Sequence, residues 1–204
     1  MMTNNGLLVV LSGPSGSGKD TVLADYLKNN PQVKKSISMT TRAIRDGETD
    51  GIDYIFVDNK QFDLYISDGM MLEYVKYSSS SYGTPKGPVD NWLNDGKTVI
   101  LKIEVEGASN IRKLYPDAVL VFIVPPSLEV LENRLRRRGS EDEDGLKKRL
   151  EIARNELNKI PEYDYIIVND ELEKCVEDFS SIINAELCKV SRNKKFISEV
   201  TQNV

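Results

Sequence analysis

The sequence contains no histidine, a residue that many enzyme active sites depend on. This absence excludes Ser-His-Asp triads, histidine-ligated metals and histidine as a general base. Any catalysis must therefore use Lys, Arg, Asp, Glu, backbone amides or a diffusible metal ion. Phosphoryl transfer is a reaction class that these groups can serve, because it needs positioning and charge neutralisation more than proton transfer.

Cysteines and long apolar runs are also scarce. Cys175 and Cys188 are the only two cysteines and form no CxxC pair, so neither a disulfide framework nor a zinc site is expected. No apolar run is long enough to span a membrane, and the first residues, MMTNNG, lack the basic and apolar regions of a signal peptide. We therefore expect a cytoplasmic protein with no membrane partner. The net charge of −5 argues against a nucleic-acid partner, since general nucleic-acid binders are usually basic.

The order of apolar segments predicts an α/β fold with a mainly parallel sheet. The chain has 204 residues, 40% of them hydrophobic, which suits one globular domain. Strand-like runs occupy residues 7–12, 98–105, 118–124 and 165–168. Helical patterns lie between or after these runs, beginning with residues 19–29, and such alternation is typical of a parallel sheet flanked by helices.

Two segments interrupt this alternation. Residues 36–90 are rich in Ser, Thr, Tyr and Gly and contain short β-like pieces, which predicts an inserted β-containing subdomain. Residues 127–157 read as two polar helices. The first should stop at Gly139, and the second should begin at Ser140, with Glu143 completing a capping box.

The last helix is expected to begin near Asp170, with Glu173 in the same capping role. Apolar residues recur along it at helical spacing and should form its buried face. These residues are Leu172, Val176, Phe179, Ile183 and Leu187.

A candidate phosphate-binding loop follows the first strand. Seven of its eight positions match the pattern, in the stretch GPSGSGKDT. The glycines allow tight turns that point amides at one anion, the following helix adds its positive end, and Lys19 can reach the β- and γ-phosphates. A Gly/Ser-rich surface turn is the alternative, but the flanking strand and helix favour a nucleotide site. Its expected ligands are Gly13, Pro14, Ser15, Gly16, Ser17, Gly18, Lys19, Asp20 and Thr21.

Asp20 occupies the eighth position, where Ser or Thr normally gives a hydroxyl to magnesium. Its carboxylate would repel a nearby phosphate unless a metal lay between them. Thr21 offers a hydroxyl one residue late, turned by about 100° around the helix. Since magnesium keeps several waters, Asp20 could hold a metal-bound water; alternatively it only stabilises the first helical turn. No protein side chain is predicted to ligate the metal directly.

A second candidate site lies in residues 38–57, SMTTRAIRDGETDGIDYIFV. Arg42 and Arg45 could clamp one phosphate through bidentate hydrogen bonds, and Tyr54 could add a third donor. Taken alone, this segment is explained more simply as a solvated, loop-rich face.

With these segments in place, nearly the whole chain resembles the guanylate kinases. The matching pieces, in the family's order and spacing, are GPSGSGKDTV, SMTTRAIRDGETDGIDYIFV, LEYVKYSSSSYGTP, LKIEVEGASNIR, FIVPPS, RLRRRG, KKRL and IVND. The resemblance implies transfer of the γ-phosphate of ATP to GMP, with Mg²⁺ as cofactor, and dGMP as a further acceptor. It also implies a core (residues 1–35, 91–126 and 158–204), a GMP-binding subdomain (36–90) and a lid (127–157).

The resemblance assigns acceptor-site roles to matching residues. Arg42, Arg45, Tyr54 and Tyr82 would hold the GMP phosphate; Ser38, Glu73 and Thr84 would recognise guanine; Glu104 would lie near the GMP ring and the metal. The carboxylate of Glu73 can accept hydrogen bonds from guanine N1–H and its 2-amino group together. Adenine has an unprotonated N1 and no amino group there, so it would leave the acid unpaired.

Lys102 departs from the family pattern, which favours an acid at this position. Glu104 lies two residues further along the predicted strand, so the two side chains should emerge on the same face of it. We therefore expect Lys102 to pair with Glu104 or to reach solvent.

The predicted lid carries candidate catalytic arginines. Arg134 and Arg138 are four residues apart and share a helix face, and Arg149 lies on the next helix. The resemblance makes Arg138 and Arg149 phosphate ligands on lid closure, with Arg134 beside them. The alternative is a solvated basic face balanced by the acidic EDED run. Asn169, at a strand's carboxyl end, would lie near adenine or cap the last helix.

Two other functions remain open. A guanylate-kinase-like binding module without catalysis usually has a damaged phosphate loop, whereas Lys19 is present here. A kinase of phosphorylated sugars would not need Glu73 and Thr84 placed for guanine. The sequence does not fix the oligomeric state, and a homo-oligomer is compatible with it.

Overall fold

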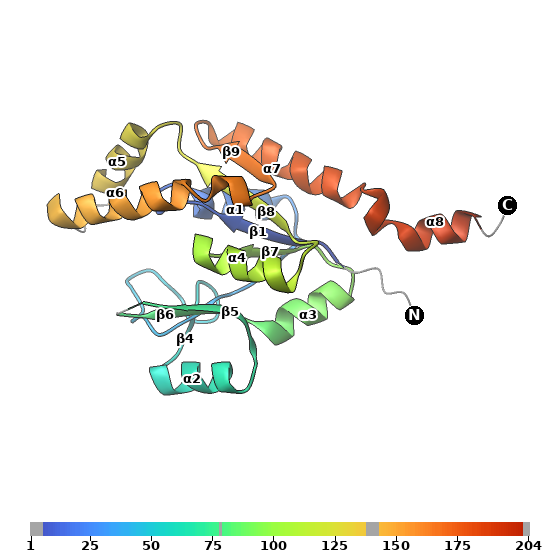
Figure 1. The fold of residues 1–204 in the computed structure, drawn as a ribbon, viewed down its shortest axis with the longest axis horizontal. Helices are drawn as coiled ribbons and strands as arrows, with labels where there is room; N and C mark the ends of the chain where they lie inside the picture. Colours follow the sequence, from blue (N-terminus) through green and yellow to red (C-terminus); the bar gives the residue numbers. More distant parts are fainter. Residues whose placement is uncertain (1–5, 78, 138–142, 202–204) are drawn as a thin grey trace.

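A computed structural model of the chain describes residues 6–77, 79–137 and 143–201, and its centre is a parallel sheet (Figure 1). The sheet has five strands in the order β2-β7-β1-β8-β9, every neighbouring pair parallel. Its strands are β1 (Leu8–Ser12), β2 (Lys34–Lys35), β7 (Val99–Lys102), β8 (Val119–Val124) and β9 (Tyr165–Val168). All residues of β1 and β8 are buried, as expected for strands covered on both faces. The predicted α/β fold with a mainly parallel sheet is confirmed.

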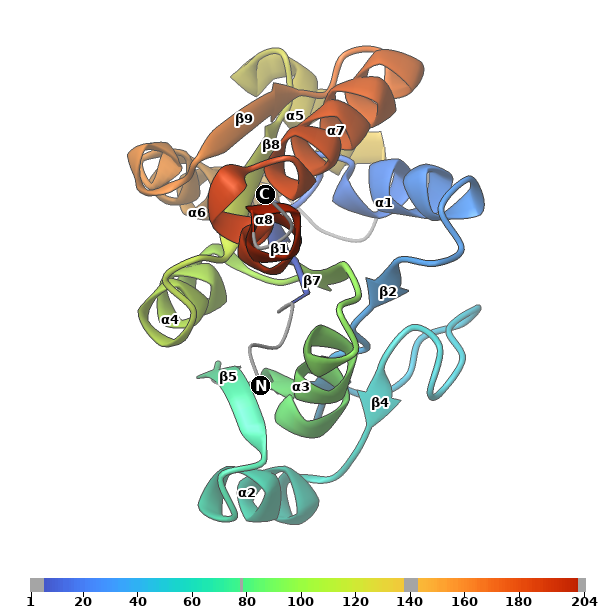
Figure 2. The ribbon, with the colours of Figure 1, turned by 90° about the vertical axis from the view of Figure 1, so that its right-hand side faces the viewer.

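Helices cover both faces of this sheet (Figure 2). On one face, α1 (Lys19–Lys28) and α7 (Leu172–Leu187) pack together, with the rings of Tyr26 and Phe179 5.0 Å apart. On the other face lie α3 (Lys86–Asn94) and α4 (Val105–Leu114). Because side chains alternate along a strand, Val9 and Leu11 join the first core while Leu8 and Val10 join the second.

A smaller sheet lies beside the core, within residues 36–90. Its four strands have the order β4-β3-β6-β5, with only β3 and β4 parallel. They are β3 (Met39–Thr40), β4 (Ile55–Phe56), β5 (Met71–Lys76) and β6 (Ser81–Pro85), and helix α2 (Asn59–Ser67) connects β4 to β5. The side chain of Asp58 caps α2 by accepting from the backbone N–H of Gln61. Strand β5 of this second sheet packs against α4. Helix α4 follows the carboxyl end of β7, so the second sheet lies near that end of the core.

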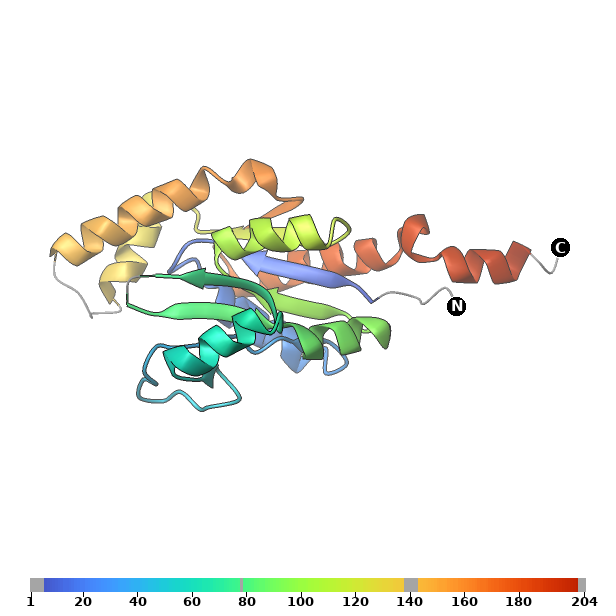
Figure 3. The same cartoon turned by 60° about the horizontal axis from the view of Figure 1, so that its bottom comes forward.

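Two helices, α5 (Leu128–Arg137) and α6 (Glu143–Leu157), project from one end of the molecule (Figure 3). They share a small core of Leu131, Leu135, Leu146 and Ala153. The predicted stop at Gly139 and capping box at Ser140 lie outside the described residues. Short 3₁₀ turns at Ile160–Glu162 and Val190–Arg192 precede β9 and the last helix, α8 (Lys194–Thr201).

Three local predictions were wrong. The strand predicted over 98–105 ends at Lys102, and the chain turns so that Glu104 precedes α4. Helix α7 begins at Leu172 without a side-chain cap, so the capping box at Asp170 does not form. On its apolar face, Phe179 and Ile183 are buried and Val176 packs against the core as predicted, but Leu172 and Leu187 are exposed, and Cys175 is buried without having been predicted. The sixteen residues of α7 span about 24 Å and overhang the short strands beneath, which leaves both ends uncovered.

Among the described residues, no helix combines the length and the apolar character needed to cross a membrane.

Candidate active site

The phosphate loop connects β1 to α1 at the carboxyl edge of the sheet. Gly13, Gly16 and Gly18 have φ values of 145°, 88° and 92°, which other residues rarely adopt. A Cβ atom on Gly18 would also lie 2.1 Å from the side-chain nitrogen of Asn169. Helix α1 begins directly after the loop, so its amino-terminal end points toward any bound anion. This arrangement is that of an anion-binding loop.

Asn169 is hydrogen-bonded to the backbone of the phosphate loop. Its Nδ2 donates a 2.7 Å hydrogen bond to the carbonyl oxygen of Ser17, and its own carbonyl accepts one of 2.9 Å from Arg134. Asn169 is buried and follows β9, while Glu171 takes the cap position of α7. The alternative that Asn169 caps the helix that follows it, α7, is therefore wrong.

Lys19 folds back over the loop. Its Nζ donates to the carbonyl oxygens of Gly13 and, at 3.0 Å, of Pro14. Burial lowers the pKa of Lys19, and the negative charges of Glu104 and Glu156 partly oppose this. The ammonium group thus lies at the loop itself. Thr21, by contrast, is exposed in the first turn of α1.

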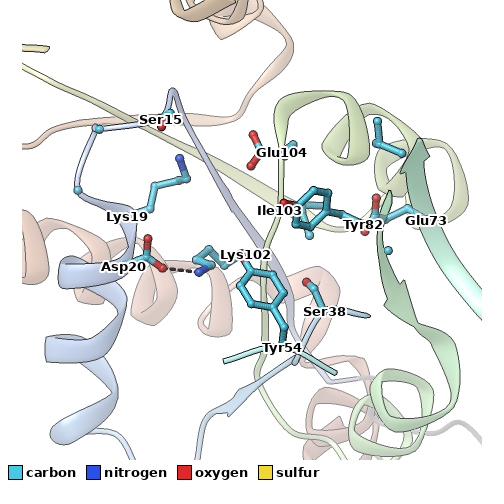
Figure 4. A pocket seen from close by; sticks show the side chains of 14 residues that line it. Ser15, Lys19, Asp20, Ser38, Tyr54, Glu73, Tyr82, Lys102, Ile103 and Glu104 are labelled. Atoms are coloured by element: carbon cyan, nitrogen blue, oxygen red, sulfur yellow. Dashed lines mark hydrogen bonds and ion pairs between the residues drawn. The ribbon is translucent and has the colours of Figure 1, made fainter. Parts of the chain in front are cut away.

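Asp20 forms an ion pair with Lys102, which the sequence did not reveal (Figure 4). The expectation that Lys102 pairs with Glu104 or reaches solvent is wrong, because β7 ends at Lys102 and its side chain meets the start of α1. Burial opposes the charge on each partner. Their mutual attraction nevertheless raises the pKa of Lys102 and lowers that of Asp20. Both groups are therefore charged near neutral pH.

One pocket joins the loop to the smaller sheet (Figure 4). The predicted site residues that line it are Ser15, Gly16, Gly18, Lys19, Asp20, Ser38, Tyr54, Glu73, Tyr82 and Glu104; Val75, Gly83, Lys102 and Ile103 complete the lining. Gly13, Pro14, Ser17 and Thr84 are buried and do not line it. Side chains from both predicted nucleotide sites thus share one cavity.

Glu73 is a buried carboxylate in this pocket. Thr84 Oγ1 donates a 2.6 Å hydrogen bond to its Oε1. Burial raises the pKa of Glu73 to about 7, with Thr84 lowering it and the charge of Glu104 raising it. The sequence analysis missed Gly107, where a Cβ would approach Glu73 Oε2 to 2.5 Å. A glycine in the first turn of a helix, as Gly107 is in α4, was the available indication that something packs closely there.

The two arginines of the acceptor segment do not line the pocket. Arg42 is held by Glu48 through hydrogen bonds of 2.7 and 3.0 Å, and its guanidinium lies 5.4 Å from the ring centre of Tyr54. Arg45 is exposed, and its backbone N–H donates to Glu48 at 2.9 Å. Glu48, another residue that the sequence analysis missed, thus organises this loop.

The lid helices reach the phosphate loop. Arg149 donates a 2.7 Å hydrogen bond to Ser15 Oγ. Arg134 donates a hydrogen bond from Nη2 to the backbone carbonyl of Asn169. Its buried Nη1 and the buried Oγ of Ser17 have no hydrogen-bond partner. Buried polar atoms without partners are rare and are expected where a ligand binds. Arg138 lies outside the described residues.

The described residues contain no cluster of three or more His, Cys, Asp or Glu side chains that could hold a metal ion. A metal used here would need most of its ligands from substrate and water, as magnesium commonly has.

Comparison with known proteins assigns this architecture to a family. The family model for guanylate kinase matches residues 5–186. Guanylate kinase of Desulfitobacterium hafniense is 44% identical over 192 residues, covering 94% of this chain and 96% of the relative. That of Carboxydothermus hydrogenoformans is 45% identical over 189 residues, covering 93% of each. The crystal structure of guanylate kinase from Anaplasma phagocytophilum matches with a TM-score of 0.77 at 34% identity, covering 94% of this chain and 92% of that one. The chain belongs to the guanylate kinase family, whose members use ATP to phosphorylate GMP to GDP.

Proposed function

We propose that this chain transfers the γ-phosphate of ATP to GMP, and also to dGMP, with ATP on the phosphate loop and the acceptor base beside Glu73. The observation that carries this assignment is that Lys19 and Glu73 line the same pocket. The loop supplies backbone amides and a lysine for phosphates. The Glu73–Thr84 pair supplies a buried, oriented acceptor for the guanine edge, with Ser38 nearby in the pocket lining.

The phosphates would be bound by residues that change partners when the nucleotides enter. Arg42 would exchange Glu48 for the GMP phosphate, with Arg45, Tyr54 and Tyr82 as further donors. Lys19 would exchange the loop carbonyls for ATP oxygens. The unpartnered nitrogen of Arg134 and the contact from Arg149 to the loop support a role of the lid in binding the transferred group. Residues 36–90 and 127–157 would thus act as the GMP-binding subdomain and the lid.

Magnesium fits this site as an ion held mainly by phosphates and water. Asp20 and Glu104 both line the pocket and offer carboxylate oxygens, and Asp20 would hold a metal-bound water. When bound, the ion neutralises charge on the phosphates. The acceptor oxygen of GMP is already anionic, so the chain needs to supply position and charge and no general base.

The test is ADP production from ATP and Mg²⁺ with GMP, dGMP, AMP, CMP and UMP offered separately. We expect rapid turnover with GMP and dGMP and little with AMP. Binding of GMP without turnover of any acceptor would refute the enzyme assignment in favour of a binding module. Comparable use of AMP would contradict the role of Glu73.

A further inference from the structure

Two residues that depart from expected sequence patterns, Asp20 from the phosphate-loop pattern and Lys102 from that of the resembled family, meet in the structure. Asp20 stands where a hydroxyl residue is expected, and Lys102 stands where an acid is expected. They are 82 positions apart in sequence, yet their side chains form one ion pair at the carboxyl edge of the sheet. Asp20 and Lys102 therefore act together at this edge, and the role of each depends on its ion pair with the other.

The pocket lining carries more acidic than basic side chains. Asp20, Glu73 and Glu104 contribute three carboxyl groups, and Lys19 and Lys102 are the basic residues that line it among the described residues. A nucleotide phosphate entering here would be repelled by Asp20 and Glu104. Arg42 does not offset them, because it forms an ion pair with Glu48 and does not line the pocket. Lys102 is the cation on the acceptor side of Lys19.

Lys102 is also oriented for a further ligand. Its side chain is 19% exposed and that of Asp20 is 66% exposed, so the pair faces the pocket rather than the core. Its Nζ lies 5.8 Å from the ring centre of Tyr54, one of the residues assigned to the acceptor phosphate. An ammonium group has three N–H donors, of which Asp20 takes one.

We propose that Lys102 binds the phosphate of the acceptor nucleotide, with Asp20 holding its ammonium group at the boundary between the donor and acceptor sites. The proposal rests on the proposed function, which places GMP between Glu73 and the phosphate loop. It adds to that function a phosphate ligand outside the set of Arg42, Arg45, Tyr54 and Tyr82. Lysine binds phosphate as a point charge, so one hydrogen bond to Asp20 does not prevent a second to phosphate.

The test is the binding of GMP and of guanosine, measured by calorimetry without ATP or Mg²⁺. Lys102→Gln is expected to weaken GMP binding by about 10- to 100-fold, the loss of one charged hydrogen bond, and to leave guanosine binding unchanged. Lys35→Gln is the matched control. Lys35 lies on the neighbouring strand β2 and interacts electrostatically with Lys102 and Asp20, but it does not line the pocket. It should change GMP affinity by less than about threefold, as expected for a charge without contact.

The double variant Asp20→Asn/Lys102→Gln distinguishes two roles of Lys102, which are binding of the GMP phosphate and neutralisation of the charge on Asp20. If Lys102 contacts phosphate, the double variant binds GMP about tenfold or more weakly than Asp20→Asn alone. Recovery of the affinity of Asp20→Asn would overturn the proposal, and so would equal losses for GMP and guanosine, which would show a structural role. If the wild-type chain bound no GMP, the proposed function itself would fail. Wild-type binding that Lys102→Gln leaves unchanged would refute the role of Lys102 alone.

Discussion

Thr84 donates a 2.6 Å hydrogen bond to Glu73, and both side chains are buried at the meeting point of β5 and β6. The bond fixes one oxygen of the carboxylate and orients the group, while Gly107 leaves room for the other oxygen. A buried carboxylate held in this way favours partners that donate two hydrogen bonds side by side.

Replacing Glu73 by alanine is expected to lower kcat/KM for GMP by about 100-fold, since two hydrogen bonds to a charged group are lost. The KM for ATP should change little, because Glu73 lies on the acceptor side of the pocket. Steady-state kinetics with each substrate varied in turn measures both effects. Equal losses for ATP and GMP would contradict the role of Glu73 in recognising guanine.

The pH dependence of guanosine binding should report the ionisation of Glu73. Burial raises its pKa to about 7, and only the ionised form accepts both guanine hydrogen bonds. Affinity should therefore rise about tenfold between pH 6 and pH 8, and Glu73→Gln should abolish this rise. Glu156 provides the control, because burial raises its pKa to about 7 as well. The variant Glu156→Gln should keep the rise in affinity between pH 6 and pH 8.

The same raised pKa affects stability with a defined sign. In the folded state the carboxyl group of Glu73 keeps its proton to higher pH than in the unfolded state, where Glu titrates near 4.5. The free energy of unfolding should thus fall as pH rises from about 4.5 to 7, relative to Glu73→Gln. A difference between the two proteins that stays constant with pH would contradict the shift.

Asn169→Ala should weaken ATP binding by about tenfold, because the carbonyl of Ser17 loses its buried hydrogen bond and the loop loses support. GMP affinity should remain within about twofold, since Asn169 does not contact the acceptor side. Calorimetry with each nucleotide measures this, and Asp170→Ala, at the exposed neighbouring position, is the control. A similar loss of GMP affinity would show that the substitution disturbs the whole site.

Asp20→Ala should raise the Mg²⁺ concentration needed for half-maximal rate several-fold, on the order of one lost water-mediated contact. GMP affinity should fall less than in Lys102→Gln, because the variant loses the residue that holds Lys102 but keeps the ammonium group itself. Rates measured across a magnesium titration, with ATP held constant, decide the matter. An unaltered magnesium requirement would exclude Asp20 from holding a metal-bound water.

Arg149→Ala should lower kcat by about 100-fold or more, because a cation that contacts the phosphate loop no longer neutralises the transferring group. GMP binding in the absence of ATP should not change. Arg154→Ala is the matched control, since this arginine is exposed on the same helix. If both variants lost the same activity, the effect would come from the net charge of α6 rather than from the position of Arg149.

Much of the fold was predictable because its evidence is local in sequence. The run before Gly13 reads as a buried strand, the glycines require positive φ values, and Lys19 begins a helix. The ends of elements were less predictable. An apolar run can continue from the end of a strand into the helix that follows it. The sequence therefore predicted a strand through Val105, although β7 ends at Lys102 and α4 begins at Val105.

The sequence by itself determined the phosphate loop, the alternation of strands and helices, and the acidic and basic residues available for chemistry. Only the tertiary structure decided which of these charges meet. Glu48 holds Arg42, Asn169 supports Ser17, and Lys102 pairs with Asp20. The last two contacts join residues 152 and 82 positions apart. Such pairs depend on strand order, which brings the carboxyl ends of distant strands to one edge and which no local pattern encodes.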